Sequence, residues 1–66
     1  MKKIIDKDEV LREYYSMYSE NTTKARLLIK KLDYHNDPYL LSEIATSYFD
    51  EDKLRLAERY LSLIHI

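Results

Sequence analysis

Residues 37–49 read Asp-Pro-Tyr-Leu-Leu-Ser-Glu-Ile-Ala-Thr-Ser-Tyr-Phe, and this stretch decides the fold. Asp37 is a favourable N-cap residue, and Pro38 suits the first position of a helix, where no backbone N–H is needed. The apolar residues that follow recur at the spacing of one helical face: Leu41, Ile44, Ala45 and Tyr48. The pattern predicts a helix from Pro38 to about Phe49.

Three further helices are predicted on either side of this stretch. The first runs from about Glu9 to Ser19, the second from about Lys24 to Tyr34, and the last from Lys53 to near the C-terminus. Their expected N-caps are, in chain order, Asp6, the polar residues 21–23 and Asp52. Their apolar stripes at helical spacing are Val10, Leu11, Tyr14, Met17 and Tyr18, then Ala25, Leu28, Ile29 and Leu32, then Leu54, Ala57, Tyr60, Leu61 and Ile64.

The composition limits the fold to one small helical domain, residues 1–66. The chain has no glycine, on which β-hairpin turns and phosphate-binding loops depend. It also has no cysteine, which excludes disulfides and thiolate metal sites. We therefore expect an all-α fold, built as small antiparallel helical hairpins or as a three- to four-helix bundle.

The two halves of the chain echo each other. Ala25, Ile29 and Leu32 recur 32 positions later as Ala57, Leu61 and Ile64. Val10, Leu11 and Tyr14 recur 34 positions later as Ile44, Ala45 and Tyr48. A repeat at this period is typical of arrays of helical hairpins. Because the two offsets differ, we expect the first helix pair to have the longer turn.

Residues 38–64 resemble the tetratricopeptide repeat family. Leu41, the pair Ile44-Ala45 and Tyr48 match the pattern of its first helix, and Ala57 matches the small residue at which its second helix crosses the first. Leu61 and Ile64 match the later apolar positions, whereas Glu51-Asp52 replace the turn glycine. The resemblance implies a protein or peptide bound on a helical surface, and it implies no catalysis.

The sequence shows no arrangement of catalytic or metal-binding residues. Its two imidazoles, His35 and His65, belong to no Ser/His/Asp or Cys/His arrangement. The acidic run 50–52 lacks the alternating oxygen ligands and the central glycine of a calcium loop. We expect no enzymatic activity, no cofactor and no metal. No apolar run is long enough to span a bilayer, so we expect a cytoplasmic protein.

More apolar residues are present than one stripe on each helix can bury, and seven of the residues are tyrosines. Surplus apolar surface and tyrosine both mark protein interfaces. We expect the partner-binding surface to include Tyr15, Tyr18, Tyr39, Leu40, Leu56, Leu63 and Ile66. The predicted function is therefore that of a small adaptor, chaperone-like partner or protein inhibitor, acting as a homodimer or in a heterocomplex.

Basic residues crowd the second predicted helix. Lys24, Arg26, Lys30 and Lys31 form a candidate face for nucleic acid or for an acidic protein. A small nucleic-acid-binding regulator is therefore the alternative function. It ranks second because the net charge of the chain is −1, whereas nucleic-acid-binding domains usually carry a basic excess.

Overall fold

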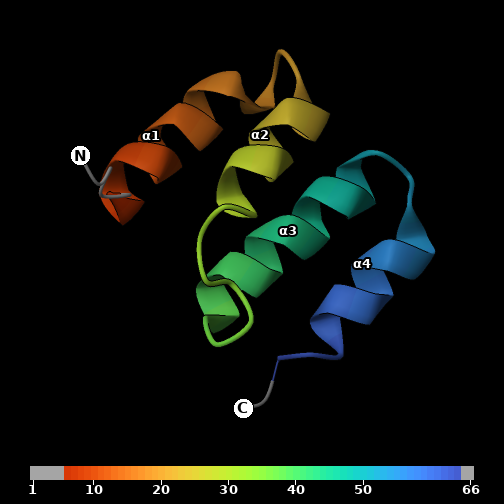
Figure 1. Ribbon diagram of the computed structural model, residues 1–66. Helices are drawn as coiled ribbons and strands as arrows, with labels where there is room; N and C mark the ends of the chain where they lie inside the picture. The colour runs from red at the N-terminus through yellow and green to blue at the C-terminus, as the bar shows by residue number, and fades with distance from the viewer. Residues whose placement is uncertain (1–5, 65–66) are drawn as a thin grey trace. The chain divides into compact units, whose positions relative to one another are not determined.

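The computed structural model describes residues 6–64, in which four α-helices follow one another along the chain (Figure 1). They are α1 (Lys7–Tyr18), α2 (Thr22–Ile29), α3 (Pro38–Asp50) and α4 (Leu54–Leu61). The described residues contain no β-strand. The predicted all-α class and the predicted helical hairpins are confirmed.

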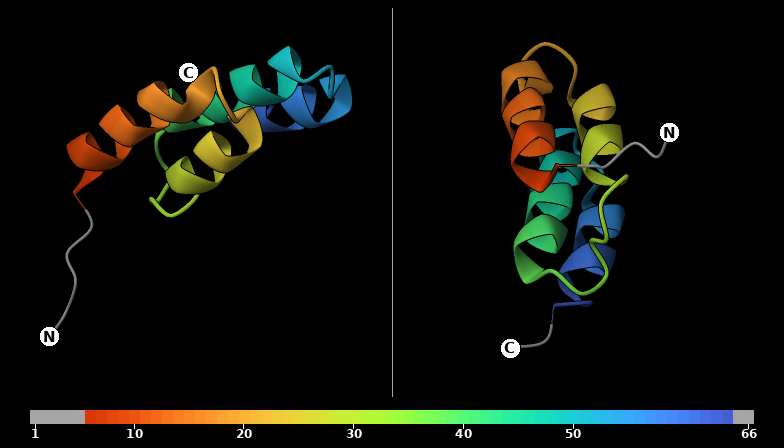
Figure 2. Two further views of the ribbon diagram at one scale, coloured as in Figure 1. Left: turned by 90° about the horizontal axis from the view of Figure 1, so that it is seen from above. Right: turned by 60° about the vertical axis from the view of Figure 1, so that its left-hand side comes forward.

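The chain divides into two compact units, Met1–Leu32 and Asp33–Ile66. In the first unit α1 packs against α2, and in the second α3 packs against α4. Figure 2 shows the two helices of each unit side by side and running in opposite directions. The links 19–21 and 51–53 each contain three residues, so the prediction of a longer first turn is wrong.

Three helices begin at a side-chain cap, as the sequence predicts. Asp37 accepts hydrogen bonds from the backbone N–H groups of Tyr39 and Leu40, at 3.0 and 3.3 Å, and Pro38 takes the first position of α3. These bonds satisfy N–H groups that have no partner inside the helix. The other two side-chain caps are Asp6 for α1 and Asn21 for α2.

The start of α4 differs from the prediction, because Asp52 does not cap it. The N-cap position falls on Lys53, whose side chain makes no capping hydrogen bond. Asp52 instead adopts a left-handed backbone conformation, with φ of 61°. The N–H of Asp52 donates to the carbonyl of Phe49 at 3.0 Å, and the N–H of Lys53 donates to the carbonyl of Tyr48 at 2.8 Å. This pair of bonds is a Schellman motif, so Asp52 ends α3.

Replacing Asp52 with glycine is expected to raise the free energy of unfolding by about 0.5–1 kcal/mol, because glycine has no Cβ to oppose positive φ. Urea unfolding followed by circular dichroism measures the change. Asp50→Gly is the matched control, since it introduces glycine at the last residue of α3, where φ is not positive, and it should not raise stability. If Asp52→Gly does not raise the free energy of unfolding, the result would argue against the left-handed conformation of residue 52.

The second helix is shorter than predicted and ends at Ile29 rather than near Tyr34. The backbone N–H groups of Lys31 and Leu32 donate to carbonyls only three residues back, at 3.2 and 2.9 Å. Such bonds tighten the last turn of a helix and end its regular ladder. Lys30 and Lys31 therefore belong to the turn after α2.

Both hairpins have a buried alanine at the same position. Ala25 is the fourth residue of α2 and Ala57 is the fourth residue of α4, and their exposed fractions are 0% and 3%. Small residues let neighbouring helices approach closely. The other buried apolar residues are Tyr14 and Ile29 in the first unit, and Leu40, Leu41, Ile44, Ala45 and Tyr48 in the second.

Candidate protein-binding surface

Helix α4 is apolar over about half of its circumference, given a rotation of about 100° per residue. The middle of this apolar side faces α3, because Ala57 is buried there and the ring of Tyr60 stacks on that of Tyr48, with 5.4 Å between centroids. One neighbouring helix covers only this middle. Two apolar flanks remain on either side of it: Leu54 and Leu61 on one, and Leu56 and the following Leu63 on the other.

The first flank continues onto α3 through Phe49. Each helix can be viewed along its axis from its first residue. In that view Phe49 lies clockwise of the buried side of α3, and Leu54 and Leu61 lie clockwise of Ala57 on α4. Since the two helices run antiparallel, these three residues share one side of the hairpin. Their exposed fractions are 62% for Phe49, 52% for Leu54 and 51% for Leu61. We call this surface, formed by Phe49, Leu54 and Leu61, the Phe49 face.

The second flank borders a small hollow. Leu63 is 43% exposed, whereas Leu56 is half-buried. The hollow has a volume of ≈ 200 Å³ and is lined by His35, Asn36, Asp37, Pro38, Leu41 and Leu63. Beside the hollow, His35 stacks on the ring of Tyr34, with 4.2 Å between ring centroids.

The structure leaves several of the predicted contact residues accessible. The exposed ones are Tyr15 (52%), Tyr39 (46%) and Leu63. The half-buried ones are Tyr18 and Leu56. Tyr15 and Tyr18 both contact the buried ring of Tyr14 edge to face, with centroid separations of 5.0 and 5.3 Å. Ile66, also predicted to contact a partner, lies outside the described residues.

The prediction that Leu40 belongs to the partner-binding surface is wrong, because its side chain is only 1% exposed. The buried side of α3 is wider than one stripe of apolar residues, and it includes Leu40, Ile44 and even Ser47. The Ser47 hydroxyl is satisfied there by donating to the Ile44 carbonyl at 2.6 Å. Leu40 is therefore a core residue.

The predicted basic face does not form as one surface. Lys24 is exposed, but Arg26 is only 5% exposed and lies on the buried side of α2 with Ala25 and Ile29. Lys24 and Arg26 are two residues apart, which corresponds to about 200° of rotation around the helix axis, so they lie on different sides of α2. The remaining two, Lys30 and Lys31, follow the end of α2. This arrangement does not favour the nucleic-acid-binding alternative.

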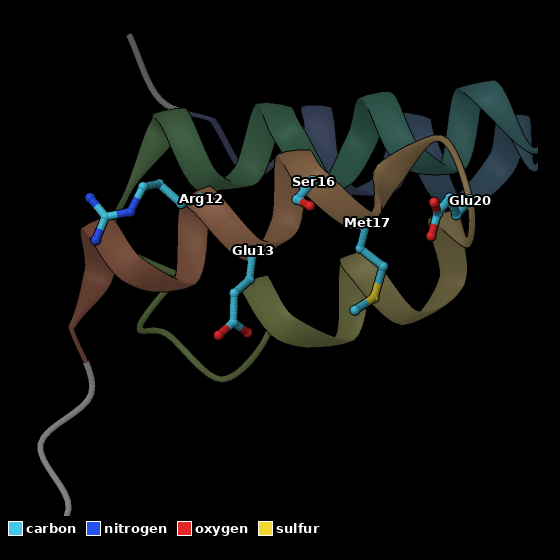
Figure 3. A pocket seen from close by; sticks show the side chains of 5 residues that line it. All are labelled: Arg12, Glu13, Ser16, Met17 and Glu20. Carbon is cyan, nitrogen blue, oxygen red and sulfur yellow. The ribbon is translucent and has the colours of Figure 1, made fainter.

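A larger hollow, of ≈ 380 Å³, lies along α1. It is lined by Arg12, Glu13, Ser16, Met17 and Glu20. All five come from α1 and the turn after it, and Figure 3 shows their side chains spread along the helix without converging on one point. A specific small-molecule site needs a few convergent polar groups in a concave pocket. We place no ligand in this hollow.

The Phe49 face was not predicted as a binding surface, because Leu54 and Leu61 belong to the predicted stripe that faces the core and Phe49 only widens the apolar side of the third predicted helix. The one signal in the sequence is the width of the apolar side of α4. It spans from Leu54 and Leu61 on one edge to Leu56 and Leu63 on the other. A single stripe that packs on one neighbour is narrower than this.

Within residues 6–64, no group of three or more histidine, aspartate or glutamate side chains is placed to hold a metal ion. No helix in that part of the chain combines the length and the apolar character that crossing a membrane requires. Comparison with known proteins gave no match to a family model, to a curated protein or to a solved structure.

Proposed function

We propose that this chain is a non-enzymatic protein-binding module of the adaptor, chaperone-like or inhibitor type, and that its partner docks on the Phe49 face. The observation that carries the proposal is the exposure of Phe49, Leu54 and Leu61, each more than half accessible on one side of one hairpin. Contiguous exposed apolar surface on a folded protein marks interaction sites.

Two further features support this proposal. The resemblance of residues 38–64 to tetratricopeptide repeats favours a protein or peptide as the ligand, and the second hairpin has the helix–turn–helix plan that such a repeat requires. The chain is also free of cysteine, which is compatible with the cytoplasmic location that we propose.

The proposal is tested with a double variant, Leu54→Gln with Leu61→Gln. We expect the native protein to co-purify from its source cells with another protein, in a complex of fixed stoichiometry. The double variant should bind that protein at least about tenfold more weakly, because loss of an apolar interface anchor typically costs more than about 1–2 kcal/mol. Calorimetry with the recovered partner measures the affinity.

The matched control replaces Arg55 and Arg59 with glutamine on the polar side of the same helix. Both arginines are exposed, so this variant makes an equal number of changes to α4 without removing apolar surface. It should keep the affinity of the wild type, and circular dichroism should show the same helix content in both variants. A protein that has no partner in its source cells, or two variants with equal affinity, would remove the proposal.

A further inference from the structure

Glu58 places a charge at the outer edge of the Phe49 face, on the side of Leu54 and Leu61 that lies away from Ala57 and α3. It follows Leu54 by four residues and precedes Leu61 by three, so it lies on the same side of α4. Its side chain is exposed, and among residues 6–64 it has no ion-pair partner. A helix that lies along Leu54 and Leu61 therefore has the Glu58 carboxylate at the edge of its contact.

The position of Glu58 disfavours a second copy of this chain as the occupant. In a two-fold dimer the same patch of each chain meets itself. If two α4 helices met antiparallel through this face, Leu54 of each copy would lie opposite Leu61 of the other. The two-fold axis would then pass beside Glu58, which brings two carboxylates together. Like charges placed face to face in an interface oppose association.

We infer that the Phe49 face binds an amphipathic helix of a different protein, one that carries a lysine or arginine at the edge of its apolar stripe, opposite Glu58. This inference rests on the proposed function and adds the chemistry of the partner to it. Leu54, Leu61 and Phe49 bind the apolar side chains of that helix, as in other grooves that accept amphipathic helices. Glu58 pairs with the basic side chain, which selects the partner and fixes its register.

Two synthetic peptides test the inference. Both are amphipathic helices of about 18 residues, long enough to be helical when bound, with leucines one and two turns apart on one face. They differ at one residue at the edge of that face, halfway along the peptide, which is lysine in one and glutamate in the other. We expect the wild-type protein to bind the lysine peptide at least about tenfold more tightly. The Glu58→Lys variant should reverse this preference, and added salt should shrink it in both proteins.

The inference is overturned if the peptides bind equally, if the glutamate peptide binds better, or if neither binds. It is also overturned if the wild type sediments as a dimer that Leu54→Gln with Leu61→Gln dissociates, because the occupant is then a second copy. The native complex separates this failure from failure of the proposed function. If that complex still depends on Leu54 and Leu61 while the peptides show no preference, the proposed function stands and only the inferred chemistry of the partner fails.

Discussion

We expect Leu41→Ala to lower the free energy of unfolding by about 2–5 kcal/mol, the usual cost of truncating a buried leucine. Leu41 is 1% exposed and lies on the side of α3 that bears the core. At about 0.05–0.15 kcal/mol per residue, a chain of this length has a total stability of about 3–10 kcal/mol. The loss is therefore a large share of the total, and urea unfolding followed by circular dichroism should show the unfolding midpoint at a much lower urea concentration.

Leu61→Ala is the matched control for this experiment, because it removes the same atoms from a leucine of the same unit that is 51% exposed. We expect a loss of less than about 1 kcal/mol, since less apolar surface returns to water and no enclosed cavity forms. Equal losses in the two variants would contradict the structure. They would place Leu61 in the core, as the apolar stripe of the sequence predicts.

The helix starts could be predicted from the sequence because capping is local. Asp37 accepts hydrogen bonds from N–H groups two and three residues further on, and Pro38 has no N–H that would need a partner. Both effects are local, so no distant residue affects the prediction. The same reasoning failed at Asp52, because an aspartate before a helix also follows another helix. The chain uses Asp52 to close the end of α3 in the left-handed conformation, a role that glycine fills more often.

The binding surface could not be predicted from helical spacing alone. Spacing shows which residues share a side of a helix, but it does not show how much of that side a neighbour covers. Leu54 and Leu40 demonstrate both errors. Leu54 belongs to the predicted stripe of α4 and is 52% exposed, whereas Leu40 lies beside the predicted stripe of α3 and is 1% exposed. Only the packing of a second element decides such cases.

The basic residues of the second predicted helix do not form one face, for a related reason. Four cations within residues 24–31 suggest a charged helix, but the helix ends at Ile29 and buries Arg26. Arginine can be buried where a partner is available, and its long aliphatic stem packs well. Composition within a segment therefore overestimates the charge that the segment presents on one face.

We expect Ala57→Leu to destabilise the protein by about 1–3 kcal/mol, the usual cost of forcing extra atoms into a packed site. Ala57 is 3% exposed on the side of α4 where Tyr60 stacks on Tyr48, so the larger side chain must push the helices apart or adopt a strained rotamer. Thermal unfolding measures the change. Arg59→Leu is the control, because it adds a leucine at an exposed position of the same helix and should change stability by no more than about 0.5 kcal/mol.

The same substitution in the other hairpin tests whether the internal echo has a physical meaning. Ala25 is the fourth residue of α2, as Ala57 is of α4, and it is fully buried. If a small residue is needed at this position for two helices to approach closely, Ala25→Leu should cost about 1–3 kcal/mol as well. A neutral Ala25→Leu beside a costly Ala57→Leu would show that only the second hairpin, the one that resembles a tetratricopeptide repeat, depends on close helix packing at this alanine.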